Sequence, residues 1–316
     1  MIARRIPAAG RDLLSERFEL DEGELGLDRA ELLRRVPGAA AVVADPTVPV
    51  DSELLDAAGP TLRVVANFAV GYDNVDLEAC RKRGVVVTNT PDVLTNATAE
   101  LAVTLMLAAA RRAGEGERMV RTGRWTGWNP AALLGQELSE STVGIVGLGR
   151  IGTRVAELLQ GFDAKLLYTT RSARPETVWS EARLGLERVE LADLVGRSDF
   201  VTLHVPLTPG TRHLVDRELL ARFKPGAVLV NTSRGALVDT AALARALREG
   251  PLGAAGLDVY EHEPEVDPAL LALENVVLLP HVGSATAATR DAMARLVAEN
   301  VIAVLEGRQP VTPVEG

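Results

Sequence analysis

The chain has 316 residues, 47% of them hydrophobic and 24% charged, which is typical of globular proteins and leaves room for two domains. The formal net charge of −9 provides no basic surplus to neutralise phosphates, which argues against a nucleic acid or an acidic membrane as partner. Cys80 is the only cysteine and is expected to be a buried apolar residue, although its neighbours Arg81 and Lys82 could make it reactive. Since no apolar run has the length of a signal peptide or a membrane span, we expect a soluble, cytoplasmic protein.

The first ninety residues alternate short apolar runs with charged helical stretches. The valine-rich runs at 39–45, 62–68 and 84–89 are bounded by turn residues, as buried parallel strands are. Between them, DSELLDAAG and NVDLEACRKRG have the polar starts and glycine ends of helices. This part of the chain is therefore expected to form a small α/β unit.

A long helix is expected next, capped by Asn96 and ending near Arg112, because residues 97–112 contain neither glycine nor proline. It is apolar on nearly all faces, which predicts that it is buried. Residues 113–140 are rich in glycine and contain Trp125 and Trp128. We interpret them as an extended arm or interface segment.

From Ser141 onward, short apolar strands alternate regularly with helices. The expected strands lie within STVGIVG, AKLLYTT, DFVTLHVPL, AVLVNTSRG, AAGLDVY and NVVLLPHVG. Such alternation predicts a doubly wound, mostly parallel sheet. Residues 285–307 follow as one helix that can return the chain to the first unit, and the tail 309–316 is expected to be loose.

The segment VGIVGLGRIG places Gly147, Gly149 and Gly152 in a dinucleotide-binding pattern. The first glycine permits a tight turn, the second lets the backbone approach a pyrophosphate, and the third lets helix and strand pack closely. The pyrophosphate then lies at the N-terminus of the helix that begins near Arg150, where free N–H groups favour anions. The intervening residues Leu148, Arg150 and Ile151 belong to the same predicted site.

The end of the next strand bears on which cofactor is used. An NAD site usually has an acidic residue there, which accepts from the ribose 2′-hydroxyl, whereas this chain has Thr170. Arg171, Ser172 and Arg174 follow, and two guanidinium groups with a hydroxyl suit a 2′-phosphate. We therefore predict a preference for NADP(H), with NAD(H) as the alternative; these arginines could instead be solvated loop charges.

Arg234, Glu263 and His281 lie at the ends of expected strands in the second part of the chain. Ligands bind beyond the carboxyl ends of the strands in doubly wound sheets, so these side chains are expected to converge there. Arg234 can hold a substrate carboxylate, His281 can donate a proton to a carbonyl oxygen, and Glu263 can orient the imidazole. Taken singly, Arg234 could be a surface ion-pair partner and His281 a loop histidine.

The remaining histidines are weaker candidates. His204 is expected to be a core residue with its hydrogen bonds satisfied near the cofactor, and His213 and His262 are expected to be exposed. No group of residues has metal-ligand spacing, so no metal is expected.

The sequence resembles the D-isomer-specific 2-hydroxyacid dehydrogenases over essentially its whole length, and most closely their glyoxylate/hydroxypyruvate reductase branch. The resemblance is carried by NFAVGYDNVDL, NTPDVLTNATAELAVTLMLAAARR, STVGIVGLGRIG, LHVPLTPGTRHLV, KPGAVLVNTSRGALVD, AAGLDVYEHEP and LLPHVGSAT. It implies two Rossmann-like or flavodoxin-like domains, with a doubly wound cofactor domain (96–285) inserted into a smaller substrate-binding domain (1–95 and 286–316). It also implies reduction of glyoxylate and hydroxypyruvate, small 2-keto acids, to glycolate and D-glycerate.

The resemblance implies the same catalytic residues, Arg234, Glu263 and His281, and substrate binding by backbone N–H groups at Val70 and Gly71, across the cleft from Arg234. It implies a homodimer formed by the cofactor domains and the arm, with Trp128 reaching the partner's substrate pocket; Trp128 could instead only fill the dimer interface. Positions implied to line the cofactor are Thr98, Val205, Pro206, Thr211, Thr232, Ser233, Asp258 and Gly283.

Several related activities remain as alternatives. GRWTGWNP also resembles a segment of phosphite dehydrogenase, but that branch has a lysine where this chain has Val70. D-3-phosphoglycerate dehydrogenase is a further alternative, although the pocket loop shows no extra arginines for a substrate phosphate. D-lactate dehydrogenase is another, although it fits the NADPH-like loop less well. A non-enzymatic role, as in the nucleotide-sensing C-terminal binding protein co-repressors, uses the same fold.

Overall fold

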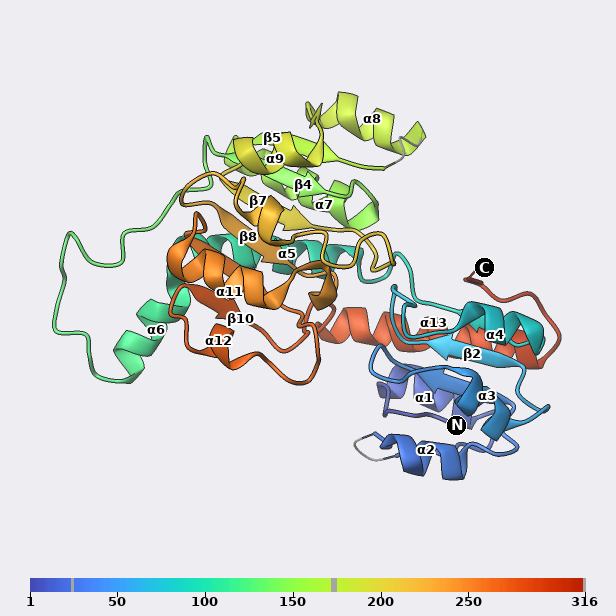
Figure 1. Cartoon of the computed structure of the whole chain (residues 1–316). Coiled ribbons are helices and arrows are strands. Elements are labelled where there is room, and N and C mark those ends of the chain that lie inside the picture. Colours follow the sequence, from blue (N-terminus) through green and yellow to red (C-terminus); the bar gives the residue numbers. More distant parts are fainter. Residues whose placement is uncertain (24–25, 172–174, 315–316) are drawn as a thin grey trace. The chain divides into compact units, whose positions relative to one another are not determined.

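The computed structural model describes residues 1–23, 26–171 and 175–314, and the chain divides into two compact units (Figure 1). Unit 1 comprises Met1–Leu94 and Ser284–Gly316, and unit 2 comprises Thr95–Gly283. These boundaries lie within two residues of those expected from the sequence. The substrate-binding role of unit 1 stays a prediction.

Unit 1 is built on a three-stranded parallel sheet in the order β1-β2-β3. The strands are β1 (Ala41–Ala44), β2 (Val64–Asn67) and β3 (Val86–Thr88). The helices are α1 (Ala8–Ser15), α2 (Arg29–Arg35), α3 (Ser52–Ala58), α4 (Leu77–Lys82) and α13 (Ala287–Leu305). The strands and helices expected in the first ninety residues are thus confirmed, and Cys80 is buried as expected.

The chain returns to unit 1 through α13, as expected, but the tail is not loose. Thr312 donates from its hydroxyl to the Asn89 carbonyl (2.7 Å) and accepts from the Asn300 side chain (2.8 Å). Val314 N donates to the Val87 carbonyl at 2.8 Å. The prediction was wrong for residues 309–314 because Asn300, buried within α13, binds the tail.

Unit 2 contains a seven-stranded parallel sheet in the order β10-β9-β8-β7-β4-β5-β6. The strands are β4 (Thr142–Val146), β5 (Lys165–Thr169), β6 (Glu187–Arg188), β7 (Phe200–Leu203), β8 (Val228–Asn231), β9 (Ala254–Leu257) and β10 (Val276–Leu278). The doubly wound sheet is confirmed. Its edge strand β6, two residues long, was not predicted.

Helices cover both faces of this sheet. They are α5 (Thr95–Ala110), α6 (Ala113–Arg121), α7 (Arg150–Leu159), α8 (Pro175–Leu184), α9 (Leu191–Arg197), α10 (Arg217–Leu220), α11 (Thr240–Glu249) and α12 (Pro268–Leu271). Two short 3-10 helices are η1 (Gln160–Phe162) and η2 (Gly235–Leu237). Side chains alternate between two cores: Val228 and Val230 pack with α5 and α7, and Leu229 packs with α9, α10 and α11.

The segment between Arg112 and Ser141 differs in part from the predicted arm. Its first nine residues form α6, which has no buried residue, and the chain then runs irregularly to β4. Figure 1 shows α6 and this loop projecting away from the sheet. Asn96 was predicted to cap α5, and this prediction was wrong. The helix begins at Thr95, and the Asn96 side chain accepts a hydrogen bond from Arg154 (2.8 Å).

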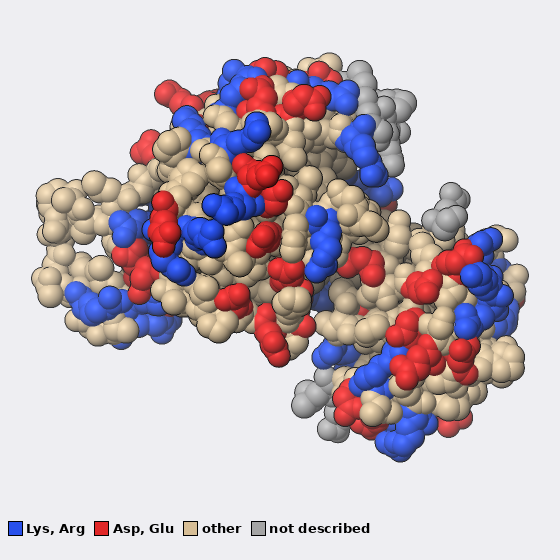
Figure 2. Space-filling view, in the orientation of Figure 1, with Lys and Arg blue, Asp and Glu red and all other residues tan. Residues whose placement is uncertain are grey.

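On the face shown in Figure 2, the described Lys and Arg side chains are interspersed with Asp and Glu. Among the described helices, none combines the length and the apolar character needed to cross a membrane.

Candidate active site

The glycine turn after β4 has the spacing that close backbone packing requires. Gly147 has φ +96°, and a Cβ atom there would lie 2.5 Å from the His204 carbonyl oxygen. A Cβ at Gly152 would lie 2.1 Å from the Gly147 carbonyl oxygen, so α7 packs directly on the turn. Gly149, by contrast, has nothing within 4 Å of its Cβ position. The middle glycine therefore leaves open space at the N-terminus of α7, where a pyrophosphate can approach the backbone.

The position of this turn in the sheet also suits a nucleotide. β4 lies between β5 and β7, and the chain builds the sheet outward from β4 in opposite directions. This is the point where ligands bind in doubly wound sheets. Val205 and Pro206 follow β7 at the same edge, and a Cβ at Gly147 would also meet the Val205 side chain at 2.7 Å.

The other residues expected to line the cofactor lie in loops that follow strands or, for Thr98, in the first turns of α5. Thr211 donates to the Pro206 carbonyl (2.7 Å), Thr98 to the Gly283 carbonyl (3.3 Å), and Ser233 to the Leu203 carbonyl (2.7 Å). The buried hydroxyl of Thr232 has no hydrogen-bond partner within the described part of the chain. An unpaired buried hydroxyl at the same edge of the sheet as an open glycine turn fits a site that a polar cofactor completes.

The residues expected to discriminate between cofactors are described only in part. Thr170 directly follows β5, and Arg171 is exposed beside it. Ser172 and Arg174 lie outside the described residues. Arg188, which sequence reasoning did not single out, donates from Nη2 to the Thr170 carbonyl at 3.1 Å.

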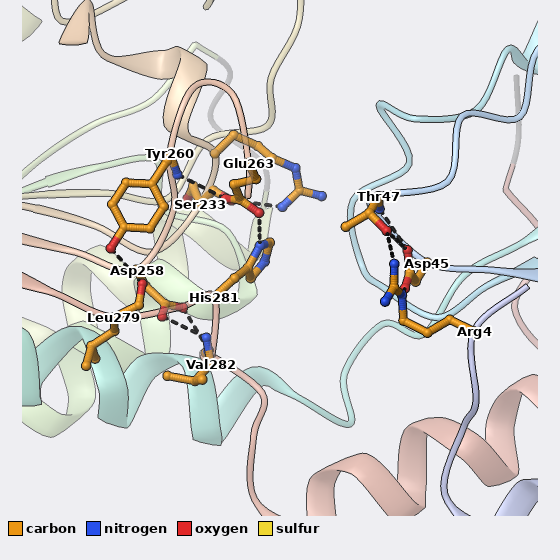
Figure 3. Close-up of polar contacts among 12 residues, drawn as sticks. Arg4, Asp45, Thr47, Ser233, Asp258, Tyr260, Glu263, Leu279, His281 and Val282 are labelled. Atoms are coloured by element: carbon orange, nitrogen blue, oxygen red, sulfur yellow. Dashed lines mark hydrogen bonds and ion pairs between the residues drawn. The ribbon is translucent and has the colours of Figure 1, made fainter. Parts of the chain in front are cut away.

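Glu263 and His281 form a hydrogen-bonded pair on neighbouring loops, shown in Figure 3. His281 Nδ1 lies 2.7 Å from Glu263 Oε2, and the other carboxylate oxygen accepts from Tyr260 N at 3.0 Å. Burial alone would raise the pKa of Glu263, but the hydrogen bond and charge of His281 hold this pKa below its ordinary value. Glu263 is therefore ionised at neutral pH, which fixes the Nδ1–H tautomer and leaves His281 Nε2 for chemistry.

Asp258 holds the backbone of the loop that carries His281. Its carboxylate accepts from the N–H groups of Val282 (2.7 Å) and Gly283 (2.8 Å), and its carbonyl accepts from His281 N (2.9 Å). His281 itself adopts φ +54°, a left-handed conformation uncommon outside glycine. Burial raises the pKa of Asp258. The orientation of His281 therefore depends on Asp258 as well as on Glu263, a role that sequence reasoning did not assign.

Arg234 is held beside this pair by its own loop. Asn231 donates from its side chain to the Arg234 carbonyl (2.8 Å), and Arg234 Nη1 donates to the Ser233 carbonyl (2.8 Å). The charge of Arg234 is among the influences that lower the pKa of Glu263, which places the two groups within electrostatic reach. The structure thus brings Arg234, Glu263 and His281 together at the carboxyl edge of the unit 2 sheet, as the sequence predicted.

In unit 1, the turn at Val70 and Gly71 is held by asparagine side chains. Asn89 donates to the Val70 carbonyl and Asn67 to the Gly71 carbonyl, both at 2.8 Å. The N–H groups of Val70 and Gly71 donate to no other group in the described residues. Because both carbonyls are occupied by amide donors, the turn offers its N–H groups to an anion.

The structure does not place Trp128 with the catalytic candidates of its own chain. Its side chain is 85% exposed on the loop after α6, so it fills no pocket of the chain that carries it. Among the other histidines, His262 is exposed as expected, whereas His213 is half-buried and bonded to Glu261 at 2.6 Å. His204 was expected to be satisfied, but its Nδ1 has no partner among the described residues, and burial lowers its pKa to about 3.

Comparison with known families decides the classification. Residues 103–283 match the family model described as the D-isomer specific 2-hydroxyacid dehydrogenase, NAD binding domain. The chain belongs to the D-isomer-specific 2-hydroxyacid dehydrogenases. Unit 2 is therefore the nicotinamide-cofactor domain of this dehydrogenase, and the described residues at its glycine turn fit that cofactor.

The similarity to known proteins extends over nearly the whole length of this dehydrogenase. It is 48% identical to a glyoxylate reductase of Thermococcus onnurineus, covering 99% of this chain and 95% of the relative. A solved Thermus thermophilus structure has 46% identity and a TM-score of 0.91, with 99% of each chain covered. The NADPH-dependent glyoxylate/hydroxypyruvate reductase of Sinorhizobium meliloti, solved with NADP and malonate, has 38% identity and a TM-score of 0.87, covering 99% of this chain and 95% of that one.

Proposed function

We propose that this dehydrogenase reduces glyoxylate and hydroxypyruvate to glycolate and D-glycerate, with NADPH preferred over NADH. The observation that carries the proposal is the Glu263–His281 pair, 2.7 Å apart and beside Arg234, at the sheet edge that also bears the glycine turn. The full-length similarity to glyoxylate reductases supports this choice of substrate. A proton donor beside a guanidinium is what reduction of a 2-keto acid requires.

The three residues then have separate tasks. The nicotinamide supplies the hydride when it is bound. His281 holds a proton at Nε2 and gives it to the substrate carbonyl oxygen, since its Nδ1 is already bonded to Glu263. Glu263 orients the ring through its hydrogen bond to Nδ1. Arg234 binds the substrate carboxylate and polarises the adjacent carbonyl through its charge.

Substrate and cofactor selectivity rest on further residues. We assign carboxylate binding to the N–H groups of Val70 and Gly71 as well, because no described group accepts from them. The NADPH preference rests on Thr170, which cannot repel a 2′-phosphate as a carboxylate would, and on the exposed Arg171 beside it.

The proposal also includes the oligomeric state. The arm after α6 exposes Trp125 (60%), Trp128 (85%) and Leu134 (68%), an apolar surface that favours contact with another copy. We propose a homodimer in which Trp128 contacts the partner's substrate site.

The test is oxidation of NADPH and NADH by purified protein with glyoxylate, hydroxypyruvate, pyruvate and phenylpyruvate, compared by kcat/KM. The proposal expects the highest values for the first two substrates with NADPH. Turnover of phosphite with no turnover of any keto acid would reassign the enzyme to phosphite oxidation. Tight cofactor binding with no turnover at all would favour a nucleotide-sensing scaffold.

A further inference from the structure

The edge strand β6 places a guanidinium at the end of β5. The two strands pair in parallel with Arg188 opposite Tyr168, and Val189 N donates to the Tyr168 carbonyl at 2.9 Å. From this register, Arg188 Nη2 reaches the Thr170 carbonyl at 3.1 Å. Thr170 occupies the position at which NAD enzymes carry the acid that binds the ribose 2′-hydroxyl. The side chain of Arg188 is thus fixed at the point where the two cofactors differ.

Among the described residues, no carboxylate pairs with the charge of Arg188. Arg188 forms no ion pair with any carboxylate of the described residues, although it lines an open hollow together with Glu187, Glu190, Asp193 and Arg197. Arg197 occupies the nearby acids, at 2.8 Å from both Glu187 and Asp193. A guanidinium has five N–H donors. Arg188 uses one of its donors on the Thr170 carbonyl, so the others and the charge remain available to a ligand.

A merely structural role explains these observations less well. A bond to one carbonyl at a sheet edge needs no charge, and a neutral donor could make it. The Thr170 carbonyl also restricts the long Arg188 side chain, which lowers the entropy lost when it binds an anion. α9, which follows β6, lies at the same end of the sheet as β5 (Figure 1). An anion at this end therefore meets two cations, Arg171, which follows Thr170 in the sequence, and Arg188, which is bonded to the Thr170 carbonyl.

We propose that Arg188 is a specificity-determining residue that binds the 2′-phosphate of NADP(H) together with Arg171. This inference rests on the proposed NADPH preference and adds a residue from a separate strand. A phosphate dianion accepts charge-assisted hydrogen bonds from guanidinium groups, whereas the neutral 2′-hydroxyl of NAD(H) gains little from them. Arg188 therefore affects NADP(H) binding and leaves NAD(H) binding unchanged.

The experiment measures binding of 2′,5′-ADP and 5′-AMP by calorimetry, using the full chain without substrate. These probes differ by the 2′-phosphate alone, so the result does not depend on turnover. Arg188→Gln removes the charge and keeps an amide donor for the Thr170 carbonyl. Arg197→Gln is the matched control, because it removes an equal charge from the same hollow where that charge is already paired. Arg188→Lys tests whether charge alone restores binding.

We expect Arg188→Gln to weaken 2′,5′-ADP about tenfold or more, with 5′-AMP changed less than about twofold, and Arg188→Lys to recover part of the loss. Arg197→Gln should change neither probe more than about twofold. Equal weakening of both probes by Arg188→Gln, or no weakening of either, would overturn the role of Arg188 while leaving the NADPH preference to Arg171. If Arg197→Gln weakens 2′,5′-ADP binding as much as Arg188→Gln does, the weakening reflects net charge alone, and the role of Arg188 is likewise overturned. If the wild type binds 2′,5′-ADP no more tightly than 5′-AMP, the NADPH preference itself is wrong.

Discussion

The backbone of Gly235 lies directly against that of Tyr260. A Cβ atom at position 235 would fall 1.9 Å from the Tyr260 carbonyl carbon and 2.4 Å from Glu261 N. Gly235 follows Arg234, and Tyr260 N donates to Glu263 at 3.0 Å. The contact therefore couples the segment that positions the guanidinium to the segment that positions the carboxylate. Only glycine allows this approach without movement of the backbone.

We expect Gly235→Ala to lower kcat/KM for glyoxylate at least tenfold, because the two segments must separate to admit a methyl group. Overpacking of this kind also destabilises the fold by about 1–3 kcal/mol. Gly210→Ala is the control, since nothing lies within 4 Å of its Cβ position. Steady-state kinetics and thermal unfolding check both effects. If Gly235→Ala is as active and as stable as the control, the backbones of Gly235 and Tyr260 can separate without loss of activity or stability.

Glu263→Gln should lower kcat by about 10²-fold while cofactor affinity stays unchanged, because the imidazolium of His281 loses its charged partner. Glutamine keeps an oxygen that can accept from His281 Nδ1 but carries no charge, so the loss of rate reports on the charge of Glu263. The exposed Glu265, on the same loop, provides the matched control as Glu265→Gln. Measurement of kcat together with the dissociation constant of NADPH distinguishes this role from a general loss of structure, which would weaken cofactor binding as well. A Glu263→Gln variant with wild-type kcat would contradict the role.

Glu263→Gln is also expected to lower the free energy of unfolding by an amount that depends on pH. The pKa of Glu263 is lowered below its ordinary value of 4.5 in the folded protein. The stability that its carboxylate contributes is therefore fully present above about pH 4.5 and is lost as the pH falls through the folded-state pKa. We expect Glu263→Gln to be less stable than the wild type by about 1–3 kcal/mol at pH 7. Denaturant unfolding should show the two proteins converging at acid pH. A constant difference at every pH would exclude this origin.

Much of the fold could be predicted from runs of apolar residues that indicate buried strands. The run 227–230 is apolar throughout because β8 is covered on both faces: Val228 and Val230 face one core, and Leu229 faces the other. The end of such a strand is where ligands bind, which is why Arg234 could be placed from its position in the sequence. Glu263 and His281 were predictable for the same reason.

Features without a hydrophobic period, or with a partner distant in the sequence, were not predictable. β6 has two residues and no hydrophobic period, so Arg188 looked like one more surface charge. Gly114 and Gly116 argue against a helix, yet α6 forms with Glu117 and Arg121 paired one turn apart. The tail looked loose because its partner, Asn300, lies in the buried part of α13.

Arg234→Ala should lower kcat/KM for glyoxylate by about 10³-fold or more, because the substrate carboxylate loses its guanidinium partner. Arg234→Lys should restore only part of the activity, since lysine keeps the charge but not the planar fork. The exposed Arg217 at the start of α10 serves as the control, as Arg217→Gln. Fluorescence titration with NADPH should show unchanged binding in all three variants. If Arg234→Ala retains wild-type kcat/KM, the carboxylate is bound elsewhere.

Two substitutions in the arm after α6 are expected to affect dimer formation and catalytic activity separately. Leu134 is 68% exposed, whereas the neighbouring Leu133 lies 3.4 Å from the Cβ position of Gly116 and holds the arm to its own helix. We expect Leu134→Asp to turn the dimer into a monomer, because a buried apolar contact between copies cannot accept an unpaired carboxylate. Trp128→Ala should remain dimeric and lose about tenfold or more in kcat/KM for hydroxypyruvate, with NADPH binding unchanged. Light scattering coupled to size exclusion, together with kinetics, separates the two effects. A wild-type protein that is monomeric at micromolar concentration would contradict the dimer, and a fully active Trp128→Ala dimer would limit this tryptophan to the interface.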